Sequence, residues 1–110
     1  AVVTHTCAAH QCTADIVYAR GYPITVNADA NTAYAADVAE NIAPGVDRDT
    51  PPIMAGEDFS YMLNQRPGAY IMLGNGDGPT VDHPMYNFND DAIPAGCSWF
   101  AEMIETRLPA

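Results

Sequence analysis

The stretch "AYIMLG", residues 69–74, decides the fold, because it is apolar throughout. A strand with one face in solvent alternates apolar and polar residues, whereas a strand covered on both faces reads as a continuous apolar run. Both faces are covered when helices pack on each side of a sheet. The stretch therefore predicts an α/β protein.

Two other segments have the character of strands. Residues 13–18 place Ala14, Ile16 and Tyr18 on one side and polar or smaller residues on the other, which is the period of a half-buried strand. Residues 52–55 form a short apolar segment between turn-rich stretches. Together with residues 69–74 they predict a mixed sheet flanked by helices.

Helices are predicted between and after these strands. Asn27 is placed to cap a helix over residues 28–43, in which Tyr34, Val38 and Ile42 recur at four-residue steps. A shorter helix is predicted within residues 56–65, and a poorer one at residues 1–11. The last helix, residues 92–108, carries an apolar stripe that predicts core packing: Ile93, Cys97, Phe100, Ile104 and Leu108.

Composition limits the partners. The chain has 14 acidic side chains against 4 basic ones and a net charge of -10, which argues against nucleic acid or an anionic membrane surface. Three cysteines fit no disulfide framework, so we interpret them as packed, reduced thiols in a cytoplasmic protein. The charged share of 16% is low for a free-standing domain, and residues 1–11 read as a helix already under way; we expect the chain to be part of a longer protein.

His83 is a candidate for chemistry because it lies in a long irregular loop after the apolar strand. Ligands of open α/β sheets collect outside the carboxyl ends of strands, and loops of this length are usually functional. A neutral imidazole is a common metal ligand, but zinc needs at least three protein ligands. Both a metal or catalytic role and a plain surface histidine stay open on these grounds.

A second candidate is the motif Gly56, Glu57 and Asp58 at the start of the short helix. The two carboxylates can simply favour the positive end of the helix. Alternatively, the glycine allows backbone N–H groups to approach a substrate carboxylate or an oxyanion.

Four blocks carry a resemblance to a known family: "RGYPITVN" at 20–27, "MAGEDFSYML" at 54–63, "RPGAYIMLG" at 66–74 and "DHPMYNFNDDAIPAG" at 82–96. In this order they resemble the carboxy-terminal third of metal-dependent amidohydrolases. The branch is that of hippurate hydrolase, N-acyl-amino-acid hydrolase and auxin-conjugate hydrolase, in the aminoacylase and carboxypeptidase clan.

The resemblance implies a domain plan. Residues 1–22 would be the last helix and strand of an inserted α+β lid domain, which also serves dimerisation, and residues 23–27 a hinge. Residues 28–110 would close a metallopeptidase-like catalytic domain with a mixed sheet flanked by helices. We therefore also expect a homo-oligomer that includes the amino-terminal part of the same protein.

The resemblance also implies a site. His83 takes the place of a metal ligand, although Pro84 follows it immediately where the family pattern has one residue between. Gly56, Glu57 and Asp58 match a motif at the edge of the active site and would bind substrate or orient other groups. Asp90 and Asp91 become caps of the final helix. The remaining ligands and the general-base glutamate of the family match nothing in this chain, so no catalytic residue is assigned.

The implied activity is hydrolysis of the amide bond of N-acyl amino acids, with two divalent ions, zinc or manganese, activating a water. The chain alone would then be inactive. The alternative is a non-catalytic binding or interaction module that kept the scaffold without the metal chemistry.

Overall fold

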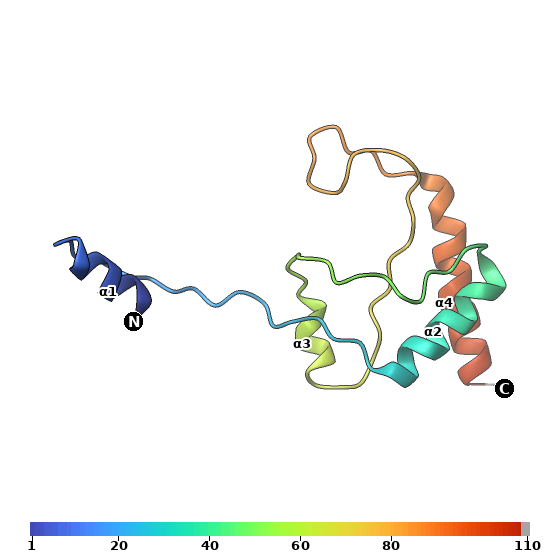
Figure 1. The fold of residues 1–110 in the computed structure, drawn as a ribbon. Coiled ribbons are helices and arrows are strands. Elements are labelled where there is room, and N and C mark those ends of the chain that lie inside the picture. The colour runs from blue at the N-terminus through green and yellow to red at the C-terminus, as the bar shows by residue number, and fades with distance from the viewer. Residues whose placement is uncertain (109–110) are drawn as a thin grey trace.

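The structure is a computed structural model that describes residues 1–108. It contains four α-helices, α1 (Val2–Ala9), α2 (Asp29–Ile42), α3 (Phe59–Leu63) and α4 (Ile93–Arg107), and a 3-10 turn, η1 (Asp90–Ala92), that leads into α4. Long stretches of open chain join them (Figure 1). All four predicted helices are confirmed, each shorter than predicted, and α3 has only 5 residues.

The predicted cap of α2 is wrong. The residue at the helix boundary is Ala28, and no side chain caps the first turn. Asn27 lies one position too early, and its side-chain amide bonds the backbone of Tyr70 instead. The helix therefore begins without a side-chain cap, with Asp29 as the acidic residue of its first turn.

The predicted strands do not form within residues 1–108, where all regular structure is helical. Residues 13–18, 52–55 and 69–74 are open chain. A strand needs a neighbour whose backbone accepts and donates the ladder hydrogen bonds. None of these segments runs beside another in a ladder, so the mixed sheet is not seen in this part of the chain.

The best-packed unit is the pair α2 and α4, which lie against each other (Figure 1). Ala35 and Val38 of α2 are buried, with 1% and 3% of their surface exposed. The Trp99 indole N–H donates to the carbonyl of Ala35 over 3.0 Å. The Tyr34 hydroxyl donates to the carbonyl of Met103 over 2.7 Å. Val38 and Tyr34 confirm part of the stripe predicted for this helix.

The same interface also has polar contacts. The Asn41 amide donates to the Glu102 carboxylate over 2.6 Å, and the Tyr34 and Thr106 hydroxyls lie 2.5 Å apart. The Arg107 guanidinium stands 5.0 Å from the centre of the Tyr34 ring, within the range of a cation–π contact. Hydrogen bonds along its length thus connect the two helices.

The stripe predicted as the core of α4 is on the wrong face. Its members Ile93, Phe100, Ile104 and Leu108 are 49–73% exposed. The face that meets α2 carries Trp99 and Met103 instead. Periodicity identifies an apolar face but cannot say which element covers it. No element of residues 1–108 packs on this stripe.

The cysteines also depart from the prediction of packed thiols. Cys12 and Cys97 are exposed and Cys7 is half-buried, and all three are free. Cys7 belongs to α1, which has no buried residue and stands at the end of an open chain, away from the other helices (Figure 1). A thiol there has no core to enter.

The dimensions reflect this open arrangement. The radius of gyration is 20.2 Å, whereas a compact chain of this length has about 13 Å. The principal extents are 68 × 35 × 21 Å, with α1 at one end of the long direction (Figure 1). Among residues 1–108, the buried apolar residues are Ala35, Val38 and Ala92, all at or near the α2–α4 pair.

Candidate functional site

His83 lies in a loop that is folded by its own backbone. Its N–H donates to the carbonyl of Thr80 over 3.2 Å, and its carbonyl accepts from the N–H of Tyr86 over 2.9 Å. Asp82, just before it, has φ of 70°, in the left-handed region that tight turns use. Two successive turns therefore flank His83, whose side chain is exposed.

The imidazole of His83 forms a hydrogen bond within the loop. Its Nδ1 accepts a hydrogen bond from the backbone N–H of Met85 over 3.1 Å. In a neutral ring, an accepting Nδ1 leaves the proton on Nε2, and a protonated nitrogen cannot bind a metal. Ligation through Nε2 thus requires the ring to leave Met85 and to present Nδ1–H to an acceptor.

A complete metal site is not assembled by these residues. In the part of the chain that the structure describes, no three His, Cys, Asp or Glu side chains gather closely enough to hold an ion. His83 has the right chemistry for one ligand of a zinc ion, because imidazole nitrogen is among the ligands that suit zinc. Residues 1–108 fit a divalent ion only as the source of a single ligand.

Gly56, Glu57 and Asp58 lie together at the start of α3, as the sequence predicts. A Cβ on Gly56 would come within 3.1 Å of the Tyr22 ring, so the absent side chain allows this ring to pack on the backbone. Tyr22 also meets Tyr61 of α3 edge to face, with centroids 6.0 Å apart. The glycine thus serves aromatic packing here.

Glu57 is held by its neighbours. Its carboxylate accepts from the N–H of Phe59 over 3.0 Å, and its carbonyl accepts from the hydroxyl of the buried Ser60 over 2.7 Å. The Phe59 N–H, and next the Tyr70 hydroxyl, keep the pKa of Glu57 below its ordinary value. Hydrogen bonds to the charged form favour it, so Glu57 is fixed as a carboxylate.

Tyr70 belongs to this group, although the sequence does not single it out. Its ring lies 5.6 Å from that of Phe59, and the Glu57 carboxylate raises the pKa of its hydroxyl. Its backbone N–H donates to the Asn27 side-chain oxygen and its carbonyl accepts from the Asn27 amide, both over 2.8 Å. An asparagine before α2 thus occupies both backbone groups of Tyr70, as a paired strand would.

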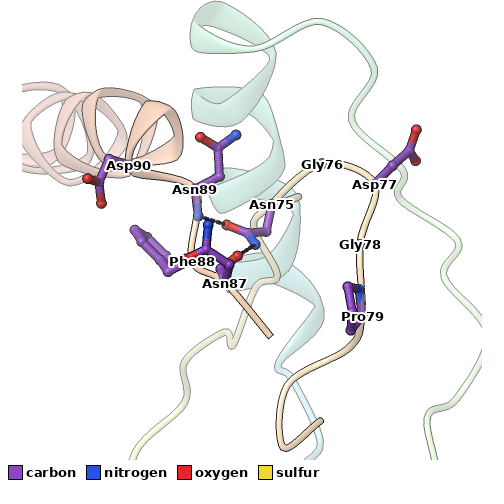
Figure 2. Close-up of a pocket in the computed structure, with 9 residues that line it drawn as sticks. All are labelled: Asn75, Gly76, Asp77, Gly78, Pro79, Asn87, Phe88, Asn89 and Asp90. Atoms are coloured by element: carbon purple, nitrogen blue, oxygen red, sulfur yellow. Dashed lines mark hydrogen bonds between the residues drawn. The ribbon is translucent and has the colours of Figure 1, made fainter. Parts of the chain in front are cut away.

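A second asparagine acts in the same way at the loop of His83. The Asn75 side-chain oxygen accepts from the N–H of Asn89 over 2.8 Å, and its amide donates to the carbonyl of Asn87 over 3.3 Å (Figure 2). These residues border an open hollow of about 530 Å³, which Gly76, Asp77, Gly78, Pro79, Phe88 and Asp90 complete (Figure 2). The hollow lies at the base of the loop.

Asp90 and Asp91 are not the caps of the final helix. The residue at the start of α4 is Ala92, and no side chain caps that helix. The side chain of Asn89 caps the preceding turn η1, because its oxygen accepts from the N–H of Asp91 over 3.1 Å. The two aspartates lie within η1, where negative charge is favourable.

The two candidate groups are separate. The open chain 69–74 runs from the end of α3 to the loop of His83, and the loop lies well away from α3 (Figure 1). The sequence predicts Asn27 only as a helix cap and Asn75 only as a turn residue, because asparagine beside a helix or a glycine is typical of those positions. Their pairing with distant backbone leaves no local signal.

Comparison with known proteins agrees with the motif blocks. Residues 2–106 match the family described as Peptidase family M20/M25/M40. The chain is 33% identical over 100 residues to "Putative amidohydrolase YhaA" of Bacillus subtilis (strain 168), covering 84% of this chain and 25% of the relative. It is 31% identical over 111 residues to "IAA-amino acid hydrolase ILR1-like 2" of Arabidopsis thaliana, covering 93% and 25%.

A third relative is "Hippurate hydrolase" of Campylobacter jejuni, 28% identical over 83 residues, covering 74% of this chain and 22% of the relative. The chain thus spans about a quarter of the length of these curated relatives. No solved structure matches it significantly. Of the helices described, none is long and apolar enough to cross a membrane.

Proposed function

Since the chain belongs to Peptidase family M20/M25/M40, we propose that the protein of which it is part hydrolyses the amide bond of N-acyl amino acids. The observation that carries the proposal is the match over residues 2–106, which includes both candidate motifs. Relatives named for hydrolysis of hippurate and of IAA-amino acids support this substrate class. In both names an acyl group is joined to an amino acid.

The domain plan is part of the proposal. Residues 1–22 would end a lid domain, residues 23–27 would be the hinge, and residues 28–110 would close the catalytic domain. The stretch of open chain between α1 and α2 supports this division. Residues 109 and 110 lie outside the described part of the chain. Residues 69–74 would join a mixed sheet that other parts of the protein complete.

His83 would supply one ligand of a site for divalent ions, zinc or manganese. Ions bound there would lower the pKa of a water and polarise the scissile carbonyl. What this chain contributes is an imidazole on a folded loop, whose ring must first leave the N–H of Met85. The other ligands and the general base would come from elsewhere in the protein.

Gly56, Glu57 and Asp58 would bind substrate or orient other groups at the edge of the site, and access to the Gly56 backbone would require the Tyr22 ring that packs on it to move. The fixed negative charge on Glu57 supports such a role, because a carboxylate held by the Phe59 N–H needs no reorganisation when a partner arrives. Glu57 is suited to accept hydrogen bonds from an amide N–H or to orient a ligand histidine. Neither task requires it to touch the ion.

The test is His83→Ala in the full-length protein, with His5→Ala as the matched control on α1. We expect hydrolysis of hippurate to fall by about 100-fold or more and the bound metal per protein to decrease, since the loss of even a supporting group costs 10–100-fold. The control should retain both. Metal content is measured by mass spectrometry of the purified protein and activity by release of glycine.

Unchanged turnover and metal content in His83→Ala would sink the ligand assignment. A full-length protein that binds no divalent ion and cleaves no N-acyl amino acid would favour the alternative of a non-catalytic binding module.

A further inference from the structure

We infer that Asn75 is the positioning residue of the loop that carries His83, because its side chain ties together the two ends of that loop. The inference rests on the proposed metal role of His83, which it deepens. Asn75 touches neither ion nor substrate in this assignment. It acts through the loop of residues 76–88, which begins directly after Asn75 and ends beside the Asn75 side chain (Figure 2).

The geometry of the tie is specific. The Asn75 oxygen accepts from the N–H of Asn89 over 2.8 Å while its amide donates to the carbonyl of Asn87 over 3.3 Å. The two bonds flank Phe88, so the side chain uses the same backbone groups that a parallel strand would use on either side of that residue. A single side chain therefore replaces a strand partner at the point where the loop closes.

Asn75 is suited to this by its chemistry and its neighbour. The carboxamide offers one acceptor and two donors in a plane, so it serves an N–H and a C=O at once. Gly76 follows with φ of 85°, a conformation open to glycine, and turns the chain away from the tie. Asn75 itself is only half-exposed, whereas the surrounding loop is exposed.

The tie also connects the loop to the final helix. Asn89, held by Asn75, caps the turn η1 by accepting from the N–H of Asp91 over 3.1 Å. Because η1 leads into α4, the bonds of Asn75 and Asn89 fix the position of the His83 loop relative to this helix. Inside the loop, the bonds of His83 to Thr80 and Tyr86 are local and cannot fix where the loop stands.

Two variants separate the bonds. Asn75→Ala removes both, and Asn75→Asp keeps the acceptor for Asn89 but turns an oxygen toward the Asn87 carbonyl. We expect amide hydrogen exchange of residues 76–89 in the full-length protein to rise roughly tenfold in Asn75→Ala and roughly threefold in Asn75→Asp. Asn87→Ala is the matched control, since the tie uses only the backbone of that residue.

The second measurement is the dissociation constant for Zn²⁺, obtained by competition with a chelating dye. We expect it to weaken in the same order, roughly tenfold and threefold, with an unchanged melting temperature. A purely structural role would lower the melting temperature and leave the order of Zn²⁺ affinities unrelated to the two bonds.

The outcomes are distinguishable. A wild-type protein that binds neither Zn²⁺ nor Mn²⁺ overturns the proposed function, and the exchange experiment still decides whether Asn75 ties the loop. A wild-type protein that binds Zn²⁺, with Asn75→Ala matching it in affinity and in exchange, overturns the inference alone.

Discussion

The α2–α4 pair gives the sharpest test of the fold, through the replacement Tyr34→Phe. The change removes one hydroxyl and keeps the ring, so packing and the contact with Arg107 remain. The hydroxyl bridges to α4 at two places, the Met103 carbonyl at 2.7 Å and the Thr106 hydroxyl at 2.5 Å. Its loss therefore isolates the polar connection between the helices.

The magnitude follows from counting hydrogens. Thr106 already lies 2.6 Å from the Glu102 carbonyl as a donor, so two hydroxyl hydrogens serve three contacts. Deleting the Tyr34 hydroxyl leaves the Thr106 hydrogen on the Glu102 carbonyl, so one net hydrogen bond is lost, with a contribution of about 0.5–1.5 kcal/mol. The Met103 carbonyl stays within its helix and is not stranded. We expect a loss of about 1 kcal/mol in the free energy of unfolding.

The assay uses Trp99, the single tryptophan of the chain, which donates to Ala35 in the same interface. Urea unfolding followed by its fluorescence reports directly on the separation of α2 from α4. For a small domain, a loss of this size lowers the urea midpoint by about 1 M. The matched control is Tyr61→Phe on α3, where the side chain is 53% exposed.

Equal urea midpoints for Tyr34→Phe and Tyr61→Phe would show that the Tyr34 hydroxyl does not stabilise the pair. The absence of a cooperative Trp99 transition in the wild type would show that the two helices do not form a unit.

Two further predictions concern the group around Tyr70. Asn27→Ala removes both bonds to the Tyr70 backbone, so the Tyr70 amide should exchange about fivefold faster or more, whereas the same change at the exposed Asn64 should have no effect; equal rates in both variants would contradict the pairing. The lowered pKa of Glu57 means that its stabilising contribution is present above the ordinary value of 4.5 and is lost as pH falls through the native pKa. Tyr70→Phe should move the Glu57 midpoint, followed by carboxyl NMR, upward toward 4.5; a midpoint that does not move would show that the Tyr70 hydroxyl does not act on Glu57.

Helices were predictable because their signals are local. The four-residue recurrence of Tyr34 and Val38 predicts α2, and the same two residues face α4 in the structure. The glycine and acidic residues before Phe59 predict the start of α3. Helical hydrogen bonds close within four residues, so the sequence contains both partners of each bond.

The face of α4 was not predictable in the same way. Its most apolar stripe, which includes Phe100 and Ile104, is exposed, and the helix meets α2 with the face of Trp99. Which of two apolar faces is covered depends on what else is present to cover it. The hydrogen bond from the indole N–H, a long-range partner choice, has no counterpart in the periodicity.

In the candidate site, too, local features could be predicted from the sequence and long-range contacts could not. The motif at Glu57 and the loop at His83 were found by residue type and spacing, whereas Asn27 and Asn75 were not. Each asparagine acts on backbone far along the chain, at Tyr70 and at residues 87–89. Every residue except proline has the same backbone N–H and C=O groups, so the sequence does not show which of them an asparagine binds. These two contacts could be identified only from the structure.

The apolar run at residues 69–74 connects these points. Ile71, Met72 and Leu73 are 39–66% exposed, although a continuous apolar run is what a strand covered on both faces requires. Within the run, the backbone of Tyr70 is paired with the Asn27 side chain. Just before the run the Gly68 carbonyl accepts from the Ala28 N–H, and just after it the Asn75 side chain bonds the backbone of residues 87 and 89. The side chains of Asn27 and Asn75 therefore form hydrogen bonds at the two ends of the run, and residues 71–73 between them have no strand partner. A sheet completed by other parts of the protein would cover residues 71–73. The bonds of Asn27 and Asn75 would then already position the group of Glu57 at one end of the run and the loop of His83 at the other.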